Sequence, residues 1–421
     1  MKKILIKNID KLFTVSNNSK LKKGLDMKKL PFIENAWIII NDDLIFDFGH
    51  MKDWKGIDNW NEFEIIDAEN GTVLPSWCDS HTHIVFSGSR EQEFVDKING
   101  LSYEEIAKKG GGILNSSMAI KNTTEEELYQ QSMIRIDEVI KGGTGAIEIK
   151  SGYGLETEQE IKMLRVIKRI KETSPITVKS TFLGAHAVPI RYKNDPDEYV
   201  SIVTDEMIPQ ISKEELADYI DVFCDKGFFT VDQTEKILKT GLNYGLKGKI
   251  HANELAYSGG IQVGVKMGAI SVDHLEFTSD KEINCLKESK TIPTLLPSTA
   301  FFLGLDYPPA RKMIDSGLPI ALASDYNPGS SPSGNIEFIF SLACIKLKMN
   351  PEEVINALTI NGAHAMELQN EFGSIEKGKK ANLIITKKIP SIAFIPYSFG
   401  KSLINKVIIE GKLYNDCTTS N

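Results

Sequence analysis

Short runs of apolar residues bounded by turn residues occur near both ends of the chain. They lie at residues 4–6, 37–40, 44–46, 382–385 and 406–409. Runs of this length, rich in isoleucine and separated by Asn, Asp, Gly and Pro, are typical of β-strands. Because the texture is the same at both ends, we expect residues 1–72 and 368–421 to pair into one small composite β-sandwich domain.

The middle of the chain has a different pattern, in which short apolar runs alternate with amphipathic helical segments. On one such segment Ile161, Leu164, Ile167 and Ile170 recur at the spacing of a single helix face. Eight strand candidates centre on residues 73–74, 146–149, 176–178, 220–223, 248–250, 270–272, 294–296 and 319–322. Strands that alternate with helices indicate the α/β class, and eight of them close a barrel. We therefore predict a (β/α)8 TIM barrel over residues 73–367.

Composition narrows the class of ligand. A net charge of −8 without a basic block argues against nucleic acid, because neutralising phosphates needs clustered Lys and Arg. The content of 41% hydrophobic and 25% charged residues suits a water-soluble globular protein, and no stretch is apolar enough to span a membrane. Five cysteines, odd in number and without a CxxC pair, suit free thiols in a reducing compartment. We expect a cytoplasmic protein that acts on a small molecule, with a homodimer as the default assembly.

Histidines mark the ends of the predicted barrel strands. Barrel enzymes carry their active sites at the carboxyl ends of the strands, so polar residues at those positions are candidates for function. Five of the seven histidines follow predicted strands: His81, His83, His186, His251 and His274. The other two, His50 and His364, do not.

A metal site is the chemistry that this pattern favours. His81 and His83 are two apart in an extended segment and point to the same side, while His251 and Asp325 follow strands five and eight. Three imidazoles and one carboxylate suit one divalent or trivalent ion per chain, zinc or iron, with room for a water. Asp325 alone would equally fit a helix cap or a turn, which the sequence at 327–329 permits.

Several motifs together resemble the imidazolonepropionase family of the amidohydrolase superfamily. They are DSHTH at 79–83, GGGI at 110–113, KSGYGL at 150–155, HANE at 251–254, DHLE at 273–276 and DYNPG at 325–329. The HxH pair and the aspartate after strand eight mark the superfamily only, whereas SGYGL, GGGI and DxNPG are specific to this family. The resemblance runs along nearly the whole chain. It implies the hydrolysis of 4-imidazolone-5-propanoate to N-formimidoyl-L-glutamate in histidine degradation.

The resemblance also implies roles for individual residues. His81, His83, His251 and Asp325 would bind a single metal, and Tyr153 and His186 match the family's substrate contacts. Independently of the resemblance, our hypothesis is that Glu254, His274 and Asp325 share proton transfer and oxyanion stabilisation, with the division among them left open. The remaining expected substrate contacts are Arg90, Tyr103, Glu254, Asn327, Gly329 and Ser330.

Three residues carry an alternative interpretation. Arg90 could bind the propionate of the substrate through a two-pronged contact, or it could form a surface salt bridge with Glu91 or Glu93. Glu254 could orient His251 instead of touching the substrate. Lys150 would bridge two ions only if a second ion existed, and otherwise it would pair with Glu148 or a neighbour.

Two other functions compete with the hydrolase. A deaminase acting on a cyclic amidine or nucleobase would use the same metal set, but a bare nucleobase does not explain Arg90 and Tyr153. A non-catalytic barrel scaffold has no reason to gather metal ligands and proton-transfer groups at its strand ends.

Overall fold

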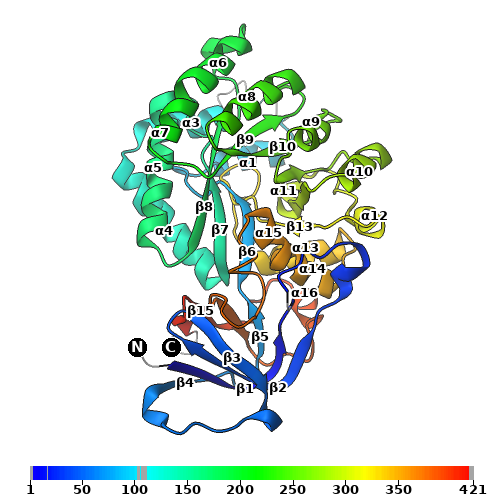
Figure 1. The fold of residues 1–421 in the computed structure, drawn as a ribbon. Coiled ribbons are helices and arrows are strands. Elements are labelled where there is room, and N and C mark those ends of the chain that lie inside the picture. Colours follow the sequence, from blue (N-terminus) through cyan, green and yellow to red (C-terminus); the bar gives the residue numbers. More distant parts are fainter. Residues whose placement is uncertain (1–2, 17, 102–104, 106–110, 417–421) are drawn as a thin grey trace.

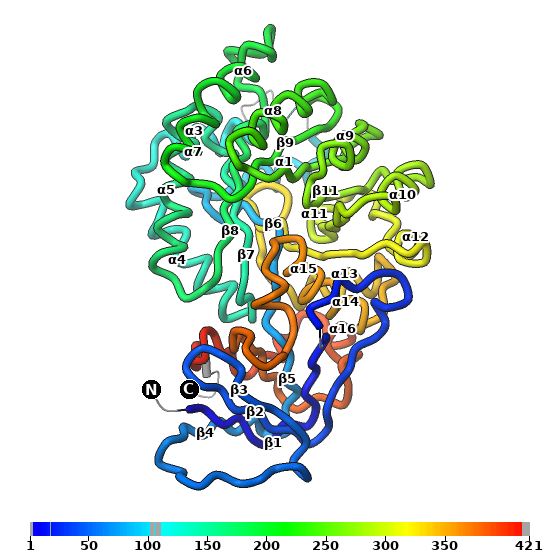
Figure 2. The backbone as a smooth tube through the Cα atoms, in the orientation of Figure 1, coloured from blue at the N-terminus to red at the C-terminus, as the bar shows by residue number. Residues whose placement is uncertain are grey.

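The structure is a computed structural model of the 421-residue chain, and it describes residues 3–16, 18–101, 105 and 111–416. Two sheets of eight strands each organise it (Figure 1). One sheet is built from the two ends of the chain and the other from its middle. Figure 2 shows the chain passing from the end sheet into the barrel and returning to the end sheet at its red C-terminal part.

The end sheet joins strands from both termini. Its order is β16 (Lys412–Asp416), β15 (Ile404–Ile409), β14 (Leu383–Thr386), β5 (Thr72–Pro75), β1 (Lys3–Phe13), β2 (Phe32–Asn41) and β3 (Leu44–His50), with β4 (Phe63–Asp67) parallel to β1. The link between the termini is the antiparallel pairing of β5 with β14, in which Leu74 faces Ile384. The sheet curls far enough for the Ile45 N–H on β3 to donate to the Lys379 carbonyl just before β14, at 2.8 Å.

Alternating apolar side chains from both halves of this sheet form one buried cluster. Ile6 on β1 and Ile38 on β2 pack in the same cluster as Leu383 on β14 and Ile408 on β15. The prediction of a composite β domain formed by both chain ends is therefore confirmed.

The second sheet is a barrel of parallel strands. They are β6 (Trp77–Thr82), β7 (Thr144–Lys150), β8 (Thr177–Ala185), β9 (Tyr219–Cys224), β10 (Lys247–Ala252), β11 (Ser271–His274), β12 (Ile292–Leu295) and β13 (Ala321–Leu322). Just beyond β13, the Asp325 N–H donates to the His81 carbonyl and the His83 N–H to the Tyr326 carbonyl, both at 2.9 Å. These bonds bring the last strand back to the first, and the predicted (β/α)8 barrel is confirmed.

One strand assignment was wrong. The apolar run at residues 73–74, predicted as the first barrel strand, lies in β5 of the end sheet, where it pairs with β1 and β14. The first barrel strand is β6, which follows directly and carries Asp79, Ser80 and His81. We did not predict β6 as a strand because its polar residues interrupt the apolar run that the search relied on.

Helices surround the barrel in Figure 1. Those before β10 are α1 (Glu91–Ile98), α3 (Ile113–Asn122), α4 (Glu125–Lys141), α5 (Thr157–Thr173), α6 (Pro196–Ile202), α7 (Ile208–Lys213) and α8 (Val231–Asn243). Those after it are α9 (Gly260–Lys266), α10 (Asp280–Lys287), α11 (Pro297–Leu303), α12 (Ala310–Asp315), α13 (Ile336–Ile345), α14 (Pro351–Leu358), α15 (Ile360–Ala365) and α16 (Phe394–Tyr397). The predicted apolar face lies on α5 and is fully buried against the core. Among the described residues, none of the helices has the length and apolar character needed to cross a bilayer.

Candidate metal centre and active site

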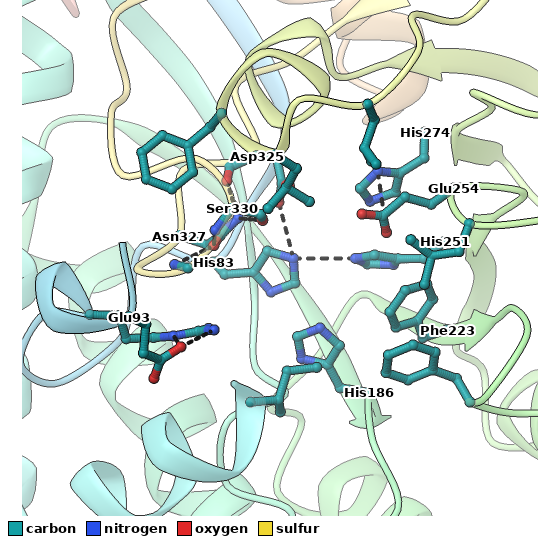
Figure 3. A pocket seen from close by; sticks show the side chains of 18 of the residues that line it. His83, Glu93, His186, Phe223, His251, Glu254, His274, Asp325, Asn327 and Ser330 are labelled. Atoms are coloured by element: carbon teal, nitrogen blue, oxygen red, sulfur yellow. Dashed lines mark hydrogen bonds and ion pairs between the residues drawn. The ribbon is translucent and has the colours of Figure 1, made fainter. Parts of the chain in front are cut away.

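Four side chains of the predicted ligand set converge at the carboxyl end of the barrel. The Nε2 atom of His83 lies 3.3 Å from the Nε2 atoms of both His81 and His251. The Asp325 Oδ1 atom lies 3.5 Å from the Nε2 atoms of His81 and His83. His83, His251 and Asp325 face one another in Figure 3. The structure thus brings together the end of β6, the end of β10 and the segment after β13.

The spacing of these four atoms fits a metal ion. Four tetrahedral ligands at about 2.0–2.1 Å from zinc stand about 3.3–3.4 Å apart. The separations that join His83 to His81, His251 and Asp325, and His81 to Asp325, are 3.3–3.5 Å and match that geometry. Burial holds the pKa of His81 and His83 well below the ordinary imidazole value, so both rings are neutral and offer a lone pair. The residues present can therefore hold one ion.

Two buried aspartates orient the imidazoles. The Asp273 Oδ2 atom lies 2.6 Å from His81 Nδ1, and the Asp221 Oδ1 atom lies 3.1 Å from His251 Nδ1. A carboxylate on Nδ1 fixes the proton there and turns Nε2 toward the metal position. The sequence analysis gave neither aspartate a role, although Asp221 is a charged residue inside the otherwise apolar strand β9, which is a usable signal.

Asp325 is held for ligation by its neighbours. Thr299 donates its hydroxyl to Oδ2 at 2.6 Å, which leaves Oδ1 directed at the histidines. Burial raises the pKa of the Asp325 carboxyl to about 6. The alternative turn role belongs instead to Asn327, whose Oδ1 accepts from the N–H groups of Gly329 and Ser330 at 2.8 Å. Asn327 therefore shapes the loop that Asp325 begins.

Glu254 and His274 lie on the far side of the cluster from His83 (Figure 3). The Glu254 Oε2 atom is 3.7 Å from His274 Nδ1. Burial, together with the charges of Asp325 and Asp225, raises the pKa of Glu254 to about 8. Asp221 takes the role of orienting His251, so Glu254 is left facing the cavity. It can carry a proton there at neutral pH.

A cavity of about 530 Å³ opens above the cluster. Its walls include nearly all the predicted contacts: His83, Arg90, Tyr153, His186, His251, Glu254, His274, Asp325, Asn327, Gly329 and Ser330. His81 lies behind this wall, in contact with His83. Tyr103 is outside the described residues. The predicted site residues therefore share one space, apart from His81, which lies behind its wall, and Tyr103, which the structure does not test.

Arg90 both lines the cavity and forms a salt bridge. Its Nε and Nη2 atoms lie 2.9 and 2.8 Å from Glu93 Oε2, so the partner is Glu93, while Glu91 bonds to Ser89. Glu93 also accepts from the Gly112 N–H at 3.0 Å and from the Asn115 amide at 2.8 Å. The carboxylate thus fixes the guanidinium from behind. Sequence spacing could not distinguish this arrangement from a surface pair.

Tyr153 and His186 form a ring wall beside His83. His186 stacks on His83 with ring centroids 5.2 Å apart, and Tyr153 lies 5.3 Å from His186. The His186 Nδ1 atom is 3.0 Å from the Gly152 carbonyl, to which it donates. Burial lowers the pKa of His186 to about 3, so its other ring nitrogen is an acceptor. This wall provides a flat face for a planar ring.

Gly329 is a glycine because of Arg90. A Cβ atom at this position would overlap the guanidinium, whose flexible end would have to move. We expect Gly329→Ala to lower kcat/KM about 10-fold through misplacement of Arg90, with the metal content unchanged. Steady-state kinetics and metal analysis measure this. Gly248→Ala is the control, because its Cβ meets nothing closer than 3.4 Å; equal losses in the two variants would contradict the explanation.

Known proteins identify the family. The model of the amidohydrolase family matches residues 72–414. An imidazolonepropionase from Christiangramia forsetii is 56% identical over 411 residues, which cover 97% of this chain and 99% of that protein. The chain belongs to the amidohydrolase family, and within it to the imidazolonepropionases. Members from Flavobacterium johnsoniae and Geobacillus kaustophilus are 56% and 42% identical over 97% and 98% of this chain, and over 99% and 98% of their own length.

Solved structures of more distant amidohydrolases share the fold of this imidazolonepropionase family member. A triazine hydrolase variant has a TM-score of 0.75 at 13% identity, with 98% of this chain and 95% of that one covered. Escherichia coli guanine deaminase has a TM-score of 0.73 at 13% identity, with 99% and 100% covered. At this identity the likeness concerns the fold alone.

Proposed function

We propose that this chain hydrolyses 4-imidazolone-5-propanoate to N-formimidoyl-L-glutamate, a step of histidine degradation. Its membership of the imidazolonepropionases, at up to 56% identity over nearly the full length, supports this activity. The main structural support is that Arg90 and the four-ligand cluster border the same cavity. That combination suits a ring with an anionic side chain.

The proposed ligands are His81, His83, His251 and Asp325, with one ion per chain. Nitrogen and oxygen atoms 3.3–3.5 Å apart suit zinc, which accepts tetrahedral ligands of both kinds, and the same residues suit iron. When bound, the ion supplies a water of lowered pKa and a Lewis acid for the ring carbonyl. The homodimer and the cytoplasmic location stay predictions.

The proton transfers fall to three side chains of this cavity. Water adds to the ring carbonyl carbon and the bond from that carbon to the ring nitrogen breaks. The carbon becomes a carboxylate that stays in the product, and the departing nitrogen takes a proton. Asp325 is placed to accept the proton of the attacking water, and Glu254, with a pKa of about 8, to donate one to the nitrogen. His274, on the Glu254 side, is placed to donate to the developing oxyanion.

The substrate's propionate is assigned to Arg90. Glu93 occupies the Nε and Nη2 edge of the guanidinium, so we assign the carboxylate of the substrate to Nη1, which lies beside Gly329 at the cavity wall. Tyr153 and His186 would cover the ring, and Asn327, Gly329 and Ser330 would form the wall opposite. Tyr103 stays a predicted contact.

Replacing Arg90 tests the assignment of the substrate. We expect Arg90→Gln to lower kcat/KM by about 30-fold or more, mainly through KM, because losing one partner of a buried charge pair costs about 2 kcal/mol or more. Loss of substrate absorbance measures turnover, and metal analysis should give one ion per chain in both proteins. Arg165→Gln is the control, since Arg165 pairs with Glu214 on the surface.

A substrate whose side chain lacks the carboxylate sharpens this test. The parent enzyme should turn this substrate over slowly, and Arg90→Gln should lower kcat/KM for it only slightly further. Equal losses on both substrates would show that Arg90 does not contact the carboxylate. If the protein binds metal but does not turn over the imidazolone, this activity is refuted and cyclic amidines become the substrates to test. If it shows neither metal binding nor turnover after reconstitution, a non-catalytic barrel scaffold is favoured.

A further inference from the structure

A layer of buried charge lies directly beneath the histidine cluster. Its members are Glu148 and Lys150 on β7, Asp221 on β9, Lys249 on β10 and Asp273 on β11, and all five are fully buried. Lys249 is two residues before His251 on the same strand, so the layer is one step deeper in the barrel. Apolar side chains ordinarily fill this position in barrels. Buried ion pairs contribute little to net stability, so the layer calls for a functional explanation.

Lys150 connects the two carboxylates that orient the histidines. Its Nζ atom lies 2.8 Å from Asp221 Oδ2 and 3.8 Å from Asp273 Oδ2. The same Asp273 oxygen is 2.6 Å from His81 Nδ1, and both oxygens of Asp221 lie 3.1 Å from His251 Nδ1. One ammonium group therefore contacts both histidine-orienting carboxylates, which come from separate strands.

Glu148 holds this ammonium in place. Its Oε1 atom is 2.5 Å from Lys150 Nζ and accepts from the Thr181 hydroxyl at 2.6 Å. Its other oxygen bonds to Lys249, which also donates to the carbonyls of Ser80 and Ala365. The position of Lys150 is thus fixed by the barrel wall on the side away from the histidines.

We propose that Lys150 is a positioning residue for the metal site: by binding Asp221 and Asp273 together, it fixes the orientation of His251 and His81. This inference rests on the proposed ligand set. An imidazole keeps its Nε2 atom turned inward only while its carboxylate partner is held in place, and an ammonium that contacts both carboxylates holds both. Burial alone would lower the pKa of Lys150, but Asp221, Glu148 and Asp273 outweigh it and raise the pKa, so the group is an ammonium.

This arrangement excludes the bridging-ligand role considered for Lys150. A bridging group must present an atom to the metals, whereas the Lys150 ammonium is directed at Glu148 and Asp221. Lys150 is also absent from the described residues that line the cavity. The pairing with Glu148 expected as the alternative is present, and it is one part of the layer.

Zinc affinity of the metal-free protein tests the proposal. We expect Lys150→Met, which keeps the length of the side chain, to bind zinc about 10- to 100-fold more weakly in competition with a chromophoric chelator. The visible absorption of the cobalt-loaded variant should also change, because it reports ligand geometry. An ammonium by itself repels a cation, so unchanged or tighter zinc binding in the variant would overturn the proposal.

A double-mutant cycle separates positioning from a general loss of buried charge. If Lys150 acts through Asp273, adding Lys150→Met to Asp273→Asn should cost less than Lys150→Met costs alone; additive losses would overturn the proposal. Lys249→Met removes the neighbouring buried ammonium and is the matched control. An equal loss of zinc affinity in Lys249→Met would assign the effect to buried charge in general and would also overturn it.

Two further measurements keep the test decisive. Thermal unfolding of the metal-free proteins shows whether each variant folds, and Lys150→Gln, which retains a donor for Asp221, should show an intermediate loss if the methionine variant does not fold. Wild-type zinc affinity in Lys150→Gln would refute the proposal. If His83→Ala bound zinc as tightly as the parent protein does, that result would instead refute the proposed ligand set.

Discussion

His83→Ala should lose zinc and lower kcat/KM by about 10³-fold or more. A metal-activated water and a polarised carbonyl together supply several kcal/mol of transition-state stabilisation, and neither survives without the ion. His83 is the ligand best suited to the test. Its Nδ1 atom has no hydrogen-bond partner among the described residues, and His186 stacks on its ring at 5.2 Å. Its removal therefore breaks no hydrogen bond to an orienting carboxylate.

Metal content and kinetics on the same preparation measure this result. His50→Ala is the matched control, because His50 caps a short helical turn that follows β3 of the end sheet, outside the barrel. This variant should keep both its metal and its turnover. Thermal unfolding of the metal-free proteins should agree within a few degrees. A His83→Ala protein with a full complement of tightly bound zinc would contradict the ligand set.

The metal cluster could be predicted from the sequence because strand ends have a simple geometry. In a barrel of parallel strands, residues that follow apolar runs meet at one rim, so His81, His83, His251 and Asp325 could be placed together without knowing any helix packing. The four are together in the structure. His81 and His83 were reached although the strand before them was misassigned, because β6 follows the predicted run directly.

Residues inside the strands were harder to predict. Asp221, Asp273 and Lys150 face inward from β9, β11 and β7, and their meaning depends on which strands are neighbours and how they are staggered. Strand order and register are long-range properties that a local pattern does not contain. The first barrel strand was misplaced for a related reason, since β6 carries polar side chains into the barrel where an apolar run was expected.

Arg90 shows a different limit of prediction from sequence, which concerns residues with two possible partners. Spacing along α1 allowed a salt bridge or a cavity-facing role, and the structure contains both, because Glu93 binds one edge of the guanidinium while the group lines the cavity. The other partners of Glu93 are Gly112 and Asn115, which lie outside α1, so the helix periodicity of α1 does not predict them. Alternatives that look exclusive in sequence can therefore coexist when a side chain has two usable edges.

Glu254→Gln should lower kcat about 10²- to 10⁴-fold while leaving metal content and KM nearly unchanged. A positioned general acid contributes a factor of this size, and glutamine keeps the shape of glutamate without a transferable proton. Burial and the nearby charges of Asp325 and Asp225 raise the pKa of Glu254 to about 8, so below that pH the group is protonated and able to donate. The variant should therefore also lose from its pH–rate profile the decline that deprotonation of Glu254 produces as pH rises.

Kinetics across pH, with Glu288→Gln as an exposed control, distinguish the possible proton donors. If Glu254 only holds His274 in place, His274→Ala should already show the full loss, and Glu254→Gln should add nothing to it. If Glu254 donates the proton, the two variants should differ in pH dependence, because only Glu254→Gln removes the titrating carboxyl. A Glu254→Gln enzyme with parental kcat would assign the transfer to Asp325, which then has to take the proton from water and return it to the ring nitrogen. That outcome would make the acid and the base of this reaction one residue.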